Sequence, residues 1–346
     1  MGEIGIGAGP PLVEVTRGEE VESLHRGVVV VADASGRVVK GIGNYEFVTF
    51  LRSAAKPLQL IPLIESGAAA RFGFTDRELA VMAGSHNGED IHLQAVASIL
   101  AKIGLGAEAL HCGIHYPFDR VASQRLREAK EEPSVLHNNC SGKHAGMLAL
   151  ALHKGHSIED YERPGHPVQE AILQSIADFA GMEPQTVIIA VDGCGAPTFT
   201  LPMRRAALAY ARLVDPRHFP PLRQEACRRV VQAMRSYPEM VGGSTGRLET
   251  ELMRLQPNTL VAKAGAEGYF AIGVLQEGGG LGIAIKMEDG SPRGRNPVVI
   301  ETLYQLGFLN LEDLERLSIY YRPPVKNRHG RVVGEIRARF RLEPRE

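Results

Sequence analysis

The stretch Phe50-Leu51-Arg52-Ser53-Ala54-Ala55-Lys56-Pro57 stands where the chain changes from strand-forming to helix-forming residues, and it holds a serine three residues before a lysine. On a helix, residues i and i+3 share a face, so a helix that begins near Ser53 brings the hydroxyl and the Lys56 amine within hydrogen-bond reach. A lysine takes the proton of a serine only when burial or positive neighbours such as Arg52 lower its pKa. The pair is therefore a candidate nucleophile and base, and the competing interpretation is a helix cap followed by a surface lysine.

Strand patterns flank this stretch on both sides of a helical middle region. A hairpin is predicted before it, and a glycine-punctuated β-meander with a closing strand after it, at 27–32, 38–42, 260–264, 268–275, 281–287 and 331–342. Between them, apolar periodicity and the capping box of Thr75 and Glu78 predict helices. We expect an α+β fold in which N-terminal and C-terminal strands form one mixed sheet. The sheet-forming domain is predicted to comprise 1–52 and 256–346, and a mainly helical region at 53–255 to contribute to the active-site cleft.

Composition restricts the class of partner. With 346 residues, 44% of them hydrophobic, and a formal net charge of -1, the chain has no basic footprint for nucleic acid. No run approaches 18 apolar residues, and Met1 to Pro11 lacks the pattern of a signal peptide. Four cysteines in so long a chain make no disulfide framework. We expect a cytoplasmic protein without a membrane span, acting on a small molecule.

Two further motifs follow the Ser-x-x-Lys spacing in a meaningful order. Ser85-His86-Asn87 lies on a glycine-flanked break between helices, where side chains are able to face a cleft. Lys263-Ala264-Gly265 lies on the first strand of the meander. Together the three are the landmarks of penicillin-recognising serine enzymes, with His86 in place of the usual aspartate and Ala264 in place of threonine or serine. The competing interpretations are an N-cap loop and a solvated strand lysine.

A second cluster is a candidate metal site. Cys140, Lys143 and His144 fall at i, i+3 and i+4 at a predicted helix start, so they share a face. With Cys194 in the loop Asp192-Gly193-Cys194-Gly195, two thiolates plus Lys143 or His144 are able to hold a tetrahedral zinc. A cysteine nucleophile and buried free thiols remain the alternatives. The glycine-rich loop 242–247 is a candidate nest for a carboxylate, or a plain loop.

Taken together, the motifs resemble the Rhizobium-type L-asparaginases, a second asparaginase family (class 3) that is unrelated to the threonine-dependent bacterial asparaginases. The resemblance runs over nearly the whole chain and is carried by Val13-Glu14-Val15-Thr16-Arg17-Gly18, Val21-Glu22-Ser23, Arg52-Ser53-Ala54-Ala55-Lys56-Pro57, Gly84-Ser85-His86-Asn87-Gly88, Asn139-Cys140-Ser141-Gly142-Lys143-His144-Ala145-Gly146-Met147, Asp192-Gly193-Cys194-Gly195-Ala196-Pro197 and Lys263-Ala264-Gly265-Ala266-Glu267-Gly268.

The resemblance implies a fold similar to serine β-lactamases and serine-dependent glutaminases, a homodimer, and hydrolysis of L-asparagine to L-aspartate and ammonia. It implies two Ser-Lys pairs, Ser53 with Lys56 and Ser85 with Lys263. It also implies a zinc near the substrate, and the residues it assigns are metal ligands Cys140, Lys143 and Cys194 and substrate-binding Arg52, His86, Asn87, His144 and Asp192.

The mechanism we expect is acyl transfer, in which Ser53 attacks the side-chain amide and water then hydrolyses the acyl-enzyme. One methylene separates asparagine from glutamine and is worth only about 1 to 3 kcal/mol in a pocket, so a glutaminase is an alternative. A β-lactamase or penicillin-binding-like serine acylase would use the same Ser53 and Lys56. A non-catalytic, zinc-stabilised binding protein is the third possibility.

Overall fold

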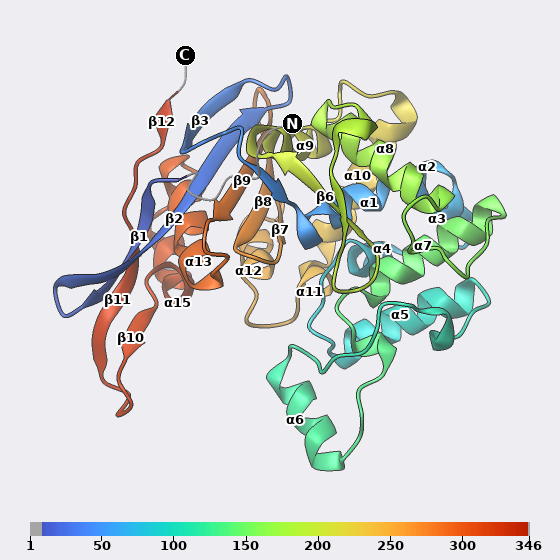
Figure 1. Ribbon diagram of the computed structural model, residues 1–346, viewed down its shortest axis with the longest axis horizontal. Coiled ribbons are helices and arrows are strands. Elements are labelled where there is room, and N and C mark those ends of the chain that lie inside the picture. Colours follow the sequence, from blue (N-terminus) through green and yellow to red (C-terminus); the bar gives the residue numbers. More distant parts are fainter. Residues whose placement is uncertain (1–8, 345–346) are drawn as a thin grey trace.

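The protein is described by a computed structural model over residues 9–344 (Figure 1). The expectation drawn from Met1 to Pro11 falls mostly on residues 1–8, which lie outside the described residues, as does the beginning of the predicted domain segment 1–52. Among the described helices, none is long and apolar enough to cross a membrane.

The main sheet joins the two ends of the chain, with strand order β10-β11-β1-β2-β9-β8-β7, and with β3 pairing β2 and β12 off this path. The α+β class with a sheet built from both termini is confirmed. In one detail the expectation of a mixed sheet is corrected, because every pairing in the described part of the chain is antiparallel. The strands are β1 Pro11–Arg17, β2 Glu20–Asp33, β3 Val38–Ile42, β7 Leu260–Ala264, β8 Tyr269–Gln276, β9 Gly279–Met287, β10 Pro324–Lys326, β11 Val332–Ala338 and β12 Glu343–Pro344.

Helices cover the centre of this sheet. Helix α9 (Met203–Val214) packs against β2, β8 and β9, and α13 (Pro292–Gln305) packs against β1, β9 and β11. The inner half of β2 is consequently buried on both faces, which explains its continuous apolar run Val28–Ala32. Gly282 allows the close approach of α9, because a Cβ at this position would lie 1.8 Å from the carbonyl oxygen of Ala207.

The middle of the chain is helical, as predicted. The capping box at Thr75 and Glu78 is present, and the apolar stripe of Val168, Ile172 and Ile176, with which the sequence also predicts a helix, lies on the helix Pro167–Ala180. The apolar segment after Ser53 is broken at Leu60, between two short helices that each carry a proline near the start. The helices are α1 Lys56–Gln59, α2 Ile61–Glu65, α3 Ala68–Arg71, α4 Asp76–Met82, α5 Asp90–Lys102, α6 Arg120–Ala129, α7 Ser141–Lys154, α8 Pro167–Ala180, α10 Pro221–Ser236, α11 Pro238–Val241, α12 Leu248–Leu255, α14 Leu311–Arg316 and α15 Ser318–Tyr321, with 3-10 turns η1 Arg52–Ala55, η2 Ala107–Ala109, η3 Val135–His137 and η4 Pro184–Thr186.

A small second sheet was not predicted. The short strand β4 (Val48–Phe50) pairs with β6 (Pro197–Pro202), which also pairs with β5 (Ile189–Val191). The strand that leads into Ser53 therefore belongs with the helical part of the chain and not with the main sheet. Its position brings the turn η1 next to the loop 192–196, which joins β5 to β6.

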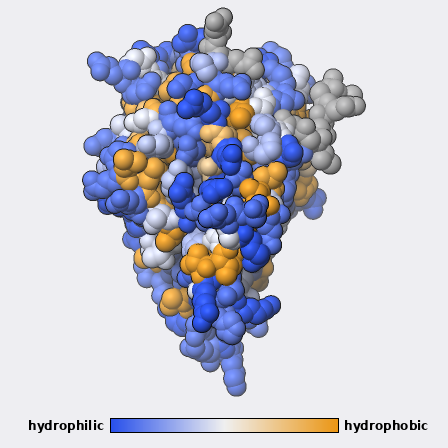
Figure 2. Space-filling model, turned by 90° about the vertical axis from the view of Figure 1, so that its left-hand side faces the viewer, coloured by the Kyte–Doolittle hydropathy of each residue, from blue (hydrophilic) through white to orange (hydrophobic). Residues whose placement is uncertain are grey.

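The outer parts of the molecule are helix α6 and the surface of the outer strands of the main sheet. Helix α6 projects from the lower edge of the molecule, away from the main sheet (Figure 1). Figure 2 shows the side formed by the outer strands, where hydrophobic residues lie in small patches among hydrophilic ones. No continuous apolar area dominates that view, so it identifies no docking face.

Candidate active site

Ser53 lies on the turn η1, which several contacts fix in place. The Leu51 N-H donates to the Phe199 carbonyl at 2.9 Å, and the buried Tyr210 hydroxyl donates to the Ala54 carbonyl at 2.6 Å. Ser53 itself is half-buried, and within residues 9–344 its hydroxyl has no hydrogen-bond partner. The hydroxyl is thus held on a fixed turn and left available.

Arg52 ties this turn to the loop after β5. Its backbone φ of +49° is unusual for a residue other than glycine and stores strain on the order of 1 to 3 kcal/mol. Its guanidinium contacts Asp192 Oδ1 at 3.0 Å through Nε and at 2.7 Å through a terminal nitrogen. Burial alone would raise the pKa of Asp192, but hydrogen bonds from Arg52 and the Gly193 N-H outweigh it and hold that pKa below its usual value. An ionised Asp192 therefore anchors the strained turn.

Lys56 joins the first two motifs in a way that the helix period did not predict. Its amine donates to the Gly84 carbonyl at 2.6 Å, to the Ser85 hydroxyl at 2.9 Å and to the Asn139 carbonyl at 3.1 Å. The direct partner of Lys56 is thus Ser85 and not Ser53. Burial lowers the pKa of Lys56, with nearby Lys143 acting in the same direction. This is the depressed pKa that a general base requires.

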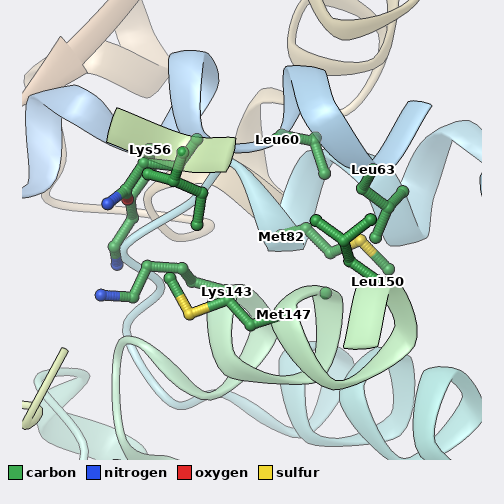
Figure 3. Close-up of a pocket in the computed structure, with 10 residues that line it drawn as sticks. Lys56, Leu60, Leu63, Met82, Lys143, Met147 and Leu150 are labelled. Carbon is green, nitrogen blue, oxygen red and sulfur yellow. The ribbon is translucent and has the colours of Figure 1, made fainter. Parts of the chain in front are cut away.

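A small apolar cavity lies beside the buried side chain of Lys56. It has a volume of about 10 Å³ and lies among α1, α2, α4 and α7. Figure 3 shows Lys56 and Lys143 at one end of it, with their amines directed away from Leu63, Met82 and Leu150. The volume is too small for a substrate. Its walls instead exclude water from the stem of Lys56.

Lys263 lies on β7 and is completely buried. Its amine donates to the Ala264 carbonyl at 2.8 Å. Burial holds its pKa well below the usual value, opposed by Glu249 and assisted by Lys56. No hydrogen bond joins Lys263 to Ser85 in the described part of the chain. The two expected Ser-Lys pairs are therefore replaced by one contact, between Lys56 and Ser85.

A cavity of about 550 Å³ opens beside these residues, and both Ser53 and Ser85 line it. Two other motifs of the sequence contribute lining residues: Asn139 from the motif that contains Cys140, and Ala264 and Gly265 from the motif that begins with Lys263. Three charged residues that the sequence analysis did not select as site residues line it as well: Arg247, Glu249 and Arg295. The glycine-rich loop 242–247 had pointed to Arg247, whereas no local signal marked the other two.

His86 and Asn87 do not line this cavity. His86 is fully buried and accepts the Gly88 N-H at Nδ1, so its Nε2-H donates to the Ser141 hydroxyl at 2.9 Å. Burial holds its pKa well below the usual value, so the imidazole is neutral. The Asn87 side chain bonds to the Thr245 carbonyl at 3.3 Å and to Arg247 at 3.1 Å. Both residues shape the loop that carries Ser85.

The candidate zinc ligands do lie together. Lys143 Nζ is 3.1 Å from Cys194 Sγ, and all three ligand residues are buried. The pKa of Cys140 is held well below its usual value by a hydrogen bond with Cys194, against the effect of burial, and then by the lysine charges. Burial alone would lower the pKa of Lys143, but the two cysteines outweigh it and raise it.

His144 extends this cluster. Its Nδ1 lies 2.8 Å from the Tyr161 hydroxyl, while its buried Nε2 has no hydrogen-bond partner in the described residues. Burial lowers the pKa of His144 to about 4, although a contact with Cys194 opposes this, so the ring is neutral.

The expected donors, two sulfurs and an amine, suit zinc chemically, because a tetrahedral zinc accepts sulfur and nitrogen ligands. Within residues 9–344, no three His, Cys, Asp or Glu side chains are placed to hold a metal together. The expected set differs from such a group in having a lysine as its third member. The zinc site therefore stays a prediction.

Comparisons with known proteins complete this description. A family model described as L-asparaginase II matches residues 13–338. No curated protein sequence matches the chain. Among solved structures, one of a protein called Mglu is 15% identical, covers 83% of this chain and has a TM-score of 0.45; the chain spans 62% of its length. A Bacillus glutaminase is 12% identical, with a TM-score of 0.37, covering 82% of this chain and 91% of its own.

Proposed function

The chain belongs to the L-asparaginase II family, and from this premise we propose that it hydrolyses L-asparagine to L-aspartate and ammonia through an acyl-enzyme on Ser53. Membership of the family, which the sequence motifs had indicated, makes the chain an amidohydrolase. The observation that carries the proposed mechanism is that Ser53 and Ser85 line one cavity while the Lys56 amine lies 2.9 Å from the Ser85 hydroxyl.

Ser53 is the proposed nucleophile because it lines the cavity and no group within the described part of the chain holds its hydroxyl. Ser85 is only 3% exposed and already accepts a hydrogen bond from Lys56. We assign Ser85 to proton transfer. When Lys56 is neutral, its two N-H groups are used by the Gly84 and Asn139 carbonyls and its lone pair accepts the Ser85 O-H, so the Ser53 proton passes to the Ser85 oxygen and the Ser85 proton to Lys56 as the new C-O bond forms. Lys56 then returns a proton to the leaving nitrogen, and ammonia departs as the amide C-N bond breaks.

The second half of the reaction uses the same groups. Water attacks the ester carbon and its proton passes to Lys56; Lys56 then returns that proton to the Ser53 oxygen as the C-O bond breaks and aspartate is released. Lys263 is the proposed electrostatic partner of this relay, because it is a second completely buried amine whose pKa the nearby Lys56 helps to lower. Arg52 and Asp192 position the turn that carries Ser53.

Zinc is part of the proposal. Cys140, Lys143 and Cys194 would hold it, and the Lys143 amine already lies 3.1 Å from Cys194 Sγ. A lysine that binds zinc must be neutral, so binding would release a proton from Lys143. When bound, the metal would supply a positive charge beside the substrate and help to orient it.

One experiment separates the candidate activities. Purified protein is assayed for ammonia release from L-asparagine and L-glutamine and for cleavage of a chromogenic β-lactam. We expect turnover of asparagine to exceed that of the other two. Faster release from glutamine would make the protein a glutaminase, and β-lactam cleavage alone would make it a penicillin-recognising acylase. No turnover of any of the three would leave a binding protein.

We also propose a homodimer in the cytoplasm, which the family resemblance implies. Light scattering on the purified protein tests the first statement, and a mass of one chain at micromolar concentration would contradict it. Fractionation of cells that express the chain tests the second, and recovery outside the cytoplasmic fraction would contradict it.

A further inference from the structure

The charges that line the 550 Å³ cavity are not balanced. Arg247 forms an ion pair with Glu249 at 2.8 Å and also donates to Asn87 Oδ1 and to the Ser85 carbonyl, each at 3.1 Å. Glu249 is almost completely buried, and although burial opposes it, Arg247 and Lys263 lower its pKa to about 2. These two residues neutralise each other and use their hydrogen-bonding groups within the protein.

Arg295 is the remaining cation of this wall. It lies in the first turn of α13, and no carboxylate of residues 9–344 is within ion-pair distance of it. Its guanidinium donates to the Asn296 side chain at 3.1 and 3.2 Å and to the Gly265 carbonyl at 3.3 Å, and it lies 5.4 Å from the centre of the Phe270 ring. The group is therefore oriented by neutral partners, and Glu249, which already forms an ion pair with Arg247, attracts it only from beyond ion-pair distance.

The position of Arg295 is tied to that of Ser53. The Gly265 carbonyl that it contacts belongs to the residue after β7, and this glycine packs on the approach to η1, since a Cβ there would lie 2.8 Å from the Leu51 carbonyl oxygen. Arg295 and Ser53 line the same cavity. A short molecule held by the one is thus presented to the other.

We propose that Arg295 binds the α-carboxylate of the substrate and so restricts the enzyme to linear amides that carry a free carboxylate. This inference rests on the proposed function. A guanidinium matches a carboxylate with two parallel hydrogen bonds, which lysine does not reproduce. Burial lowers the pKa of Arg295, which means that the cation lacks solvation that an anionic ligand would restore.

The test compares Arg295→Met and Arg295→Lys with Arg293→Met, a matched control on the exposed side of the same helix. Ammonia release is measured with L-asparagine and with its α-amide, in which the carboxylate is replaced by a neutral group. For Arg295→Met we expect kcat/KM for asparagine to fall about 10- to 100-fold, mainly through KM, and kcat/KM for the α-amide to change less than threefold. Arg295→Lys should fall between wild type and Arg295→Met, and Arg293→Met should match wild type.

Two results would overturn the inference. One is a kcat/KM for asparagine that Arg295→Met leaves within twofold of wild type. The other is an equal loss for both substrates, which would show a structural role. If the wild-type protein releases no ammonia from any amide, the proposed function fails and the inference is tested separately by calorimetric titration with L-aspartate. Binding at least tenfold weaker in Arg295→Met than in wild type would support it, and a smaller loss or no binding to either protein would overturn it.

Discussion

Replacing Ser85 by alanine should shift the pH dependence of the reaction. The Lys56 amine has three hydrogen-bond acceptors, at 2.6, 2.9 and 3.1 Å, and Ser85 Oγ is the middle one. The substitution leaves two, in a site from which water is excluded. A hydrogen bond to a charged group contributes about 1.5 to 3 kcal/mol, and the neutral amine loses part of the same contact. A net loss of about 1.4 kcal/mol for the ammonium corresponds to a tenfold change in its proton affinity.

The acid limb of kcat/KM should therefore move to lower pH by about 1 unit in Ser85→Ala, because the neutral base persists further into acid. The plateau should also fall, since the proposed proton path is cut. The assay is ammonia release from L-asparagine between pH 4 and 9. Ser175→Ala is the matched control: this buried serine donates to the Leu58 carbonyl on the same helix as Lys56, at 2.9 Å, without contacting the amine. An acid limb that stays at the wild-type position in Ser85→Ala, or that moves equally in Ser175→Ala, would refute the reasoning.

Three further outcomes are expected. Tyr210→Phe removes a buried 2.6 Å hydrogen bond to a carbonyl of η1 and should lower the free energy of unfolding by about 1 to 2 kcal/mol in urea titrations; an unchanged midpoint would contradict this. Asp192→Asn should lower the free energy of unfolding by about 1 to 3 kcal/mol at pH 7, because the contact with Arg52 holds the pKa of Asp192 below its unfolded value. That stabilisation is complete above about pH 4 and is lost as pH falls through the folded pKa. The unfolding free energies of the two proteins should therefore converge in acid. Cys140→Ser should lower the zinc content measured by elemental analysis at least fivefold relative to Cys227→Ser, a buried cysteine of α10, and equal zinc in both would remove the metal assignment.

Local signals in the sequence were enough for much of the fold. The capping box at Thr75 and the period of α8 are each set by residues within one or two turns, and both are present. Of the small sheet β4-β6-β5, short strands near 47–50 and 186–191 are predictable from the sequence, but β6, bounded by Pro197 and Pro202, and the pairing of the three strands were missed. Strand pairing across about 150 residues leaves no periodicity in either partner.

The partners of the side chains in the candidate site also depend on contacts between distant parts of the chain. Helical spacing placed Lys56 beside Ser53, but the chain enters through a 3-10 turn, and the buried amine finds its acceptors at residues 84, 85 and 139. These contacts depend on tertiary packing, as does the role of Arg295, which belongs to no motif. Residue types were therefore predictable from the sequence, whereas their partners were not.

The central claim is that Ser53, and not Ser85, carries the acyl group. The most direct measurement is mass spectrometry of peptides from enzyme quenched in acid during turnover of L-asparagine. The account predicts an aspartyl ester on Ser53 in the wild type and no adduct in Ser53→Ala, which should also lose nearly all activity while unfolding at the wild-type temperature. An adduct on Ser85, or turnover by Ser53→Ala above a few per cent of wild type, would contradict the account.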